Sequence, residues 1–283
     1  MLSATPNQPP ENLKTKKQLA EQRLKGVKAV GVIHTNKYSL YLYDINDPSS
    51  VQRKRKISNK QKAALARGRK TAAKNRYKKR WMFSERDRIE DRNEAIISSQ
   101  EILAEKDKYL ILDTETTGLD KPEIVQIGII DLEGTIIFDQ RIKPKNEIEP
   151  EAIEVHGITN EALANEPSFA DIYSGLINIL KDKILLFYNA SFDELVFYIT
   201  CSENEQPAID IKSKCLMKMY AEYFGEWSYY YEDYVWQKLG GDHEAIADCQ
   251  KTLDILKQMA ESEIIDVAEA FKRDWEEYEK ANF

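Results

Sequence analysis

The chain has 283 residues, of which 42% are hydrophobic and 10% aromatic, enough apolar material for one or two folded domains. No run approaches the roughly eighteen consecutive apolar residues of a membrane span, and the opening MLSATPNQPPENLKTKK is too polar for a secretory signal, so we expect an intracellular, cytoplasmic protein without a membrane partner. The three cysteines are odd in number and widely spaced, which argues against a disulfide framework or a zinc site.

The first hundred residues contain a candidate hairpin and a candidate connector helix. Residues 1–25 are rich in Pro, Asn, Gln and Lys, which predicts a flexible start. The stretches VKAVGVIHT and YSLYLYDI alternate in polarity on either side of Asn36 and Lys37, which predicts the two strands of a hairpin. Residues 85–106 carry isoleucine and leucine at seven-residue spacing among charges, which predicts a one-sided connector helix.

A strongly basic segment lies between the hairpin and the connector. Residues 51–80 hold 14 Lys and Arg and no Asp or Glu, so the segment carries +14 and the rest of the chain −21. A helix of thirty residues would be about 45 Å long and could contact several phosphates of a nucleic acid, with Tyr77 and Trp81 as possible stacking groups. A solvated tail or a targeting signal is the alternative. The candidate nucleic-acid ligands are Arg53, Lys54, Arg55, Lys56, Arg67, Arg69, Lys70, Lys78, Lys79 and Arg80.

The second half has the pattern of an α/β domain. The runs KYLILDTET, EIVQIGIIDLE and TIIFDQRIK predict an antiparallel meander of three strands, and KILLFYNA predicts a fourth strand. Helical patterns occupy residues 168–182, 191–201, 214–224, 229–240 and 243–263. The tyrosines of the 223–234 stretch could stack on bases, although packing in a helical core is the use that we expect for most of them. Helices packed on a sheet give an α/β domain of roughly 150 residues.

Two carboxylates interrupt the first of these strands. Asp113 and Glu115 are two residues apart, so their side chains point to the same face of a strand in a mostly apolar setting. They should repel each other unless a proton or a cation compensates them, and clustered oxygen ligands are what Mg²⁺ or Mn²⁺ prefers. A solvated strand end is the alternative for this pair alone. Further acidic and imidazole groups, Asp193, His243 and Asp248, stand at the starts of two predicted helices.

Three blocks in this half resemble, in order, the motifs of the DEDDh 3'-to-5' exonucleases, the DnaQ-like group of the ribonuclease H-like superfamily. DTETTGL at 113–119 looks like the first motif, NASFD at 189–193 the second, and HEAIAD at 243–248 the third. The segment EVHGITNEAL at 154–163 is also similar to one in proofreading-type members. The chain departs from the pattern at Tyr188, where many members have His. The resemblance covers about residues 109–260.

The resemblance implies a fold and a domain organisation. We expect an α/β, ribonuclease H-like exonuclease domain, a mixed sheet flanked by helices, at residues 108–263. A basic, partly helical N-terminal extension would occupy residues 1–107, and a helical tail residues 264–283.

The resemblance also implies the site. Two Mg²⁺ or Mn²⁺ ions would be held by Asp113, Glu115, Asp193 and Asp248. His243 would be the general base, on the first turn of its helix or the loop before it. A turn or capping role is the alternative for His156 and Asn189. The residues expected to contact the terminal nucleotide are Thr116, Gly118, Leu119, His156 and Asn189.

The implied activity is metal-dependent hydrolysis of phosphodiester bonds at 3' ends of DNA or RNA, with release of nucleoside 5'-monophosphates. The partner would be a nucleic acid with a free 3' end, with a nucleoprotein partner possible through the N-terminal extension. The alternative is a catalytically silent nucleic-acid-binding adaptor that keeps the fold. The sequence leaves the choice between DNA and RNA open, because no motif reveals contacts to the 2' hydroxyl.

Overall fold

The computed structural model describes residues 9–35, 37–54, 58–241 and 243–283. The chain forms two compact units, one ending at Ala73 and the other beginning at Lys74. The first unit contains a small sheet with strand order β1-β4-β3, and a separate β2-β5 pair. Leu19, Tyr43 and Val51 form its buried core. Its elements are β1 (Leu13–Thr15), α1 (Lys16–Glu21), β2 (Leu24–Gly26), β3 (Gly31–His34), β4 (Ser39–Asp44) and β5 (Val51–Arg53).

These elements confirm the hairpin and correct the flexible start. Strands β3 and β4 pair antiparallel, with Val32 opposite Tyr41. A flexible start is wrong for residues 13–25, because a strand, a helix and a second strand occupy most of this stretch. Helix α1 begins there because Thr15 and Gln18 form a capping box. Residues 1–8 lie outside the described part of the chain.

The basic segment is only partly helical. Helix α2 (Asn59–Trp81) has 23 residues, so a thirty-residue helix is wrong, and Arg53 lies in β5 instead. Arg55 and Lys56 lie outside the described residues. The π-helical η1 (Met82–Arg86) and helix α3 (Asp87–Ala104) follow α2, and α3 confirms the predicted helix in this region. The short 3₁₀ helix η2 (Lys106–Lys108) leads into the sheet.

Tyr77 and Trp81 are not free to stack on bases, which corrects our expectation. Both pack against α9 (Val267–Asn282), with the Tyr77 and Tyr278 ring centroids 4.6 Å apart. The indole Nε1 of Trp81 donates a hydrogen bond of 2.8 Å to Asp274 Oδ2. These buried aromatic contacts attach α9 to the end of α2.

A five-stranded mixed sheet of order β10-β9-β6-β7-β8 is the centre of the second unit. Strands β6 (Tyr109–Thr116), β7 (Ile124–Ile130) and β8 (Ile136–Arg141) confirm the antiparallel meander. Strand β9 (Ile184–Phe187) confirms the fourth strand and runs parallel to β6. The fifth strand, β10 (Ser213–Cys215), was not predicted, because three residues are too few to show a strand period.

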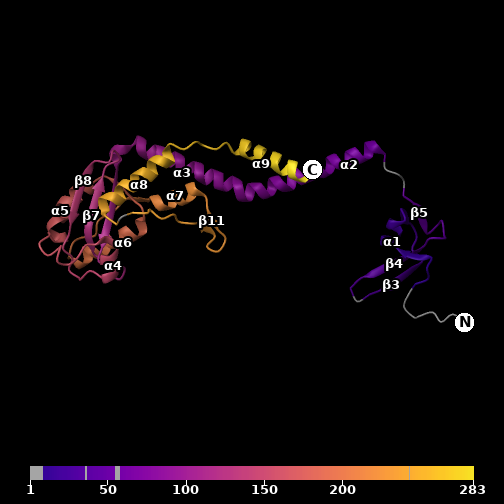
Figure 1. The fold of residues 1–283 in the computed structure, drawn as a ribbon, viewed down its shortest axis with the longest axis horizontal. Helices are drawn as coiled ribbons and strands as arrows, with labels where there is room; N and C mark the ends of the chain where they lie inside the picture. The colour runs from indigo at the N-terminus through magenta and orange to yellow at the C-terminus, as the bar shows by residue number, and fades with distance from the viewer. Residues whose placement is uncertain (1–8, 36, 55–57, 242) are drawn as a thin grey trace. The chain divides into compact units, whose positions relative to one another are not determined.

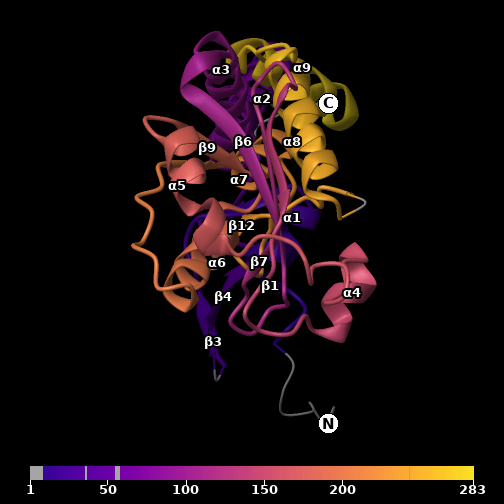
Figure 2. The ribbon, with the colours of Figure 1, turned by 90° about the vertical axis from the view of Figure 1, so that its left-hand side faces the viewer.

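Helices cover both faces of this sheet (Figures 1 and 2). Helices α5 (Phe169–Leu180) and α6 (Ala190–Glu203) pack on one face, around Phe169, Phe187 and Phe197. Helix α8 (Ala245–Ala260) lies on the other face, together with α7 (Leu216–Phe224) and α3. Helix α4 (Pro150–His156) was not predicted and packs in a small cluster of its own.

The predicted helix at residues 229–240 is wrong. This described stretch carries the end of a short hairpin of β11 (Trp227–Ser228) and β12 (Asp233–Tyr234), and then an irregular segment. Tyr229, Tyr230 and Tyr231 are 75% to 86% exposed, so core packing is wrong for these three. Tyr223 and Tyr234 do pack, and the Tyr234 hydroxyl donates to Asp91 Oδ2 at 2.6 Å. The prediction was wrong because the tyrosines of this stretch have the spacing of an apolar helical face.

Gly128 allows α8 to lie directly on β7. A Cβ added at Gly128 would sit 2.8 Å from the backbone carbon of Ala245, closer than real Cβ atoms approach a backbone. We therefore expect Gly128→Ala to lower the free energy of unfolding by about 1–3 kcal/mol, as overpacking does. Urea unfolding measures this change. Gly175→Ala in α5 is the control, because its Cβ would meet no described atom within 4 Å. Equal destabilisation by both substitutions would contradict the close contact.

Candidate active site

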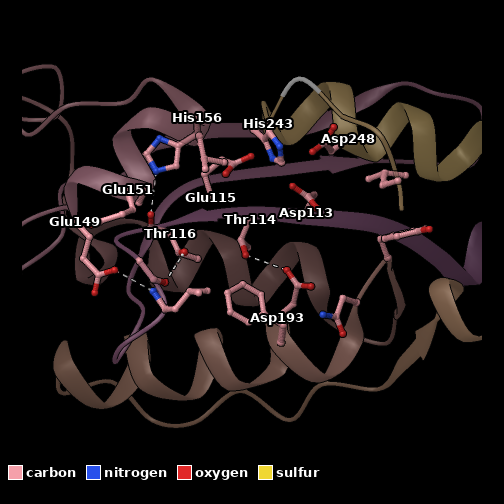
Figure 3. A pocket seen from close by; sticks show the side chains of 18 residues that line it. Asp113, Thr114, Glu115, Thr116, Glu149, Glu151, His156, Asp193, His243 and Asp248 are labelled. Carbon is pink, nitrogen blue, oxygen red and sulfur yellow. Dashed lines mark hydrogen bonds between the residues drawn. The ribbon is translucent and has the colours of Figure 1, made fainter. Parts of the chain in front are cut away.

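The carboxyl end of β6 meets the first turns of α6 and α8 in a cavity of about 590 Å³ (Figure 3). The structure brings the ligand candidates of all three sequence blocks into this one lining, although they are far apart in the chain. The lining includes the catalytic candidates Asp113, Glu115, Asp193, His243 and Asp248. It also includes the nucleotide-contact candidates Thr116, Gly118, Leu119, His156 and Asn189.

Three of these side chains are close enough to share an ion. One ligand atom each of Glu115, His243 and Asp248 lies within 4.8 Å of the other two. Glu115 and Asp248 are buried, whereas His243 is exposed. Asp113 lies on the same strand as Glu115, two residues earlier (Figure 3). This donor set of clustered carboxylate oxygens fits a hard divalent cation such as Mg²⁺ or Mn²⁺.

Asp193 reaches the cavity from the opposite face of the sheet. It lies in the first turn of α6, and the Thr114 hydroxyl donates a hydrogen bond of 2.9 Å to its Oδ1 (Figure 3). Because side chains alternate along a strand, Thr114 points toward α6 while Asp113 and Glu115 point toward α8. The end of β6 therefore connects the carboxylates of both faces.

Burial and mutual repulsion raise the pKa values of these carboxylates. Burial, followed by the charges of Asp248, Glu244 and Asp193, raises the pKa of Glu115 to about 8. Burial also raises the pKa of Asp193 to about 7, against the opposing effect of the Thr114 hydrogen bond. The pKa of Asp113 lies well above its usual range because of burial and of the neighbouring Asp193 and Glu115. A bound cation would reverse this preference and hold the groups ionised.

These shifts predict how stability depends on pH without metal. The pKa values of Glu115 and Asp193, about 8 and about 7, exceed the ordinary 4.5 and 3.8, so the folded state keeps protons that the unfolded chain releases. The stability of the metal-free protein should therefore fall as the pH rises from about 4 to about 8. Thermal unfolding in EDTA measures this, and Mn²⁺ should raise the midpoint more at alkaline than at acidic pH. A Glu115→Gln variant that keeps the full wild-type slope would contradict this origin.

His243 lies on the loop before α8, as the sequence predicted. Its φ of +53° is in the left-handed region, and Glu244 follows it as the N-cap residue of the helix. The Glu244 side chain accepts a hydrogen bond of 2.9 Å from the backbone N–H of Ala247. The imidazole is exposed at the cavity while Asp248 lies one turn deeper in α8.

His156 has a positioning role as well as a place in the lining. Its Nδ1 accepts a hydrogen bond of 3.0 Å from the backbone N–H of Ile158, so the proton is on Nε2. That Nε2 donates to the carbonyl of Thr116 at 3.0 Å (Figure 3). Burial lowers the pKa of His156, which keeps the ring neutral. The Nδ1 bond fixes the ring at the end of α4, and the Nε2 bond ties that end to the end of β6.

Asn189 and two acidic residues also line the cavity. Asn189 precedes α6, and within the described part of the chain its side chain makes no capping hydrogen bond. Glu149 and Glu151 also line the cavity and were missed by the sequence analysis. The Glu149-Pro150 pair could have revealed them, because proline favours the first position of a helix. Glu149 lies so close to Gly118 that a Cβ there would meet its carboxylate at 2.1 Å.

Comparison with known families agrees with this geometry. The exonuclease family model RNase_T matches residues 110–256, more than half of the chain. The chain belongs to this exonuclease family. It is a DEDDh-type member of the ribonuclease H-like superfamily, and therefore a nuclease with nucleic acid as its partner. Members of the family generally use divalent metal ions. In the described part of this exonuclease, no helix is long and apolar enough to cross a membrane.

Similar proteins differ in how much of their length the exonuclease spans. An uncharacterized exonuclease, CP81 of Escherichia phage 186, is 35% identical over 174 residues, which are 55% of this chain and 89% of the relative. The DNA polymerase III subunit epsilon of Buchnera aphidicola is 39% identical over 97 residues, which are 30% of this chain and 41% of that subunit. Exonuclease X, solved with 5' overhanging duplex DNA, is 24% identical with a TM-score of 0.40 and covers 58% of this chain and 99% of its own.

Proposed function

We propose that this nuclease is a metal-dependent 3'-to-5' exonuclease that releases nucleoside 5'-monophosphates from the 3' ends of DNA or RNA. The observation that carries the proposal is the convergence of four acidic side chains and one histidine, from β6, α6 and the start of α8, in one cavity. The volume of about 590 Å³ is within the range of small-ligand sites, which suits a single terminal nucleotide.

The roles follow from the positions of the side chains. Asp113, Glu115, Asp193 and Asp248 would hold two Mg²⁺ or Mn²⁺ ions, which when bound neutralise phosphate charge and activate water. His243 accepts a proton from the attacking water, since an exposed imidazole at the cavity can exchange that proton with solvent. Thr116, Leu119 and Asn189 contact the terminal nucleotide, and His156 keeps α4 against the end of β6.

The direct test uses two substrates, a single strand whose 3' end is free and the same strand whose 3' end is blocked. In Mg²⁺, we expect stepwise release of mononucleotides from the free end and none from the blocked one. Matched DNA and RNA strands in the same assay identify the substrate class. Internal cleavage of both strands, or release from the 5' end, would contradict the proposed polarity.

We also propose that α2 contacts the phosphates of the bound strand. Residues 59–80 hold no Asp or Glu, and Arg67, Arg69, Lys79 and Arg80 are exposed. Within the described residues, these four side chains form no salt bridge. Lys78 is less available, because its Nζ lies 6.0 Å from the centroid of the Phe271 ring in α9. Unpaired cations on one helix suit a polyanion without sequence preference.

Neutralising these four side chains to glutamine should weaken binding and flatten its salt dependence. The slope of log affinity against log salt should fall by about 0.7 for each lost phosphate contact on a single strand. Hydrolysis of a dinucleotide should change little. The matched control neutralises four exposed lysines outside α2, Lys181, Lys212, Lys214 and Lys218. Equal losses in the two quartets would mean that net charge, not α2, determines binding.

A further inference from the structure

The backbone at His243 needs external support. A φ of +53° is uncommon for a residue with a side chain, and such a conformation persists only when its surroundings fix it. Gly240, three residues earlier, is also left-handed with a φ of +70°. Gly241 leaves no room for movement toward the helix, because an added Cβ would lie 1.9 Å from Asp248 Oδ1. Contacts on either side of His243 must hold the imidazole in place.

The support after His243 comes from Gln126 on β7. The Gln126 Nε2 atom donates one hydrogen bond of 3.0 Å to Glu244 Oε1 and another of 3.2 Å to Asp139 Oδ1. An amide nitrogen carries two hydrogens, so both are used and the orientation of the amide is fixed. The second oxygen of Glu244 accepts from Ala247 N–H, which caps α8. Glu244 therefore joins the sheet to the helix start, one residue after His243.

Gln126 is well placed to transmit this support to the site. It is 4% exposed and lies directly opposite Glu115 in the ladder between β6 and β7. A buried amide costs free energy unless its hydrogen bonds are made, and here they are made to two carboxylates. A glutamate at this position would repel Asp139 and Glu244, and a methionine would remove both hydrogen bonds that the amide donates.

The support before His243 comes from two other side chains. The Tyr188 hydroxyl donates a hydrogen bond of 2.6 Å to the carbonyl of Gln237. The Lys251 ammonium donates one of 2.7 Å to the carbonyl of Gly240, from α8 back to the loop. Tyr188 is the residue at which the chain departs from the common His of its family. These two bonds hold the loop at Gln237 and Gly240. The end of the loop, at His243, is held by Glu244.

We propose that Gln126 is a positioning residue that holds His243 at the cavity through Glu244. The inference rests on the proposed function, in which His243 accepts the proton of the attacking water. Gln126 is not among the residues that line the cavity. Its loss should lower kcat while leaving KM and metal affinity nearly unchanged, because the acidic side chains of β6 and α6 do not depend on it.

The test replaces Gln126 by methionine, which keeps the length and removes both donors. We expect kcat to fall by about 10-fold or more, as it does when a residue that orients a directly acting side chain by hydrogen bonds is replaced. The matched control is Gln140→Met, because the Gln140 amide also donates twice, to the Arg141 carbonyl and to Glu166, and neither partner belongs to α8. Glu244→Gln is the second variant, which should reproduce the loss if Gln126→Met does not fold.

A double-mutant cycle with His243→Gln tests whether Gln126 acts through His243 or through another residue. If Gln126 acts through His243, Gln126→Met should have no further effect on kcat in the His243→Gln background. Additive losses would overturn the proposal. So would a parallel loss of Mn²⁺ affinity in calorimetry, because Gln126 would then act through Asp248 on the same helix. Full kcat in Gln126→Met beside an inactive His243→Gln would overturn only this inference. Full activity of His243→Gln would overturn the role proposed for His243, whereas the end-blocked strand tests the exonuclease function separately.

Discussion

Asp113→Asn is expected to abolish nucleotide release while stabilising the metal-free fold. Asp113 is one of the four proposed metal ligands that line the cavity, and its pKa is raised well above the usual range by burial and by Asp193 and Glu115. Removing the carboxylate should cost about 10³-fold or more in rate, since the charge of the substrate phosphate would be less well compensated. The same change relieves repulsion among Glu115, Asp193 and Asp248, so the midpoint of thermal unfolding in EDTA should rise.

Two measurements on the same preparation separate these effects. Mononucleotide release in Mg²⁺ reports catalysis, and thermal unfolding with and without Mn²⁺ reports the charge cluster. Asp120→Asn is the matched control, because Asp120 is an exposed carboxylate in the loop that follows β6. It should leave both quantities near the wild-type values. A fully active Asp113→Asn, or one less stable than wild type in EDTA, would contradict the assignment of Asp113 as a metal ligand.

His243→Gln is expected to slow hydrolysis by about 10² to 10⁴-fold, the usual contribution of a general base. Mn²⁺ affinity should remain close to that of the wild type, because the carboxylates are untouched. Single-turnover kinetics with excess enzyme measure the chemical step, and calorimetric titration measures the ion. Both quantities are measured because His243 is also close enough to bind an ion. One of its ring nitrogens lies within 4.8 Å of ligand atoms of Glu115 and Asp248. A loss of Mn²⁺ affinity in proportion to the rate would assign His243 as a ligand instead.

The sequence predicted the sheet and the cavity better than it predicted their surroundings. The strand period of KYLILDTET and its neighbours determines which residues are buried, so the meander could be derived from local pattern. The resemblance of the three motifs to those of the DEDDh exonucleases implied that Asp113, Asp193 and Asp248 share one site, and all three line one cavity. Both kinds of signal are local in the chain, which is why they could be found without a structure.

The features that escaped prediction depend on contacts between distant segments. Gln126 and Glu244 are 118 residues apart, and nothing in either neighbourhood shows that they pair. The aromatic residues of α2 looked exposed because their partners lie in α9, almost two hundred residues later. The 229–240 stretch shows the reverse error, since its tyrosines have a helical spacing but form no buried face. Contacts that form only in the folded chain decide the first two cases, and the lack of a buried face decides the third.

The two sides of the cavity differ in how tightly they are packed, at the start of α8 and at α4. Gly128 and Gly241 leave no space around the start of α8, whereas α4 rests on a small cluster of Val125, Ile148, Ile158 and Leu163 outside the main core. The segment that carries α4 is tied to the rest of the domain by His156 and Glu149, and also by Glu123, whose carboxylate accepts from the backbone N–H groups of Lys145 and Asn146. We therefore expect substitutions in α4 to disturb the fold less than substitutions at the start of α8.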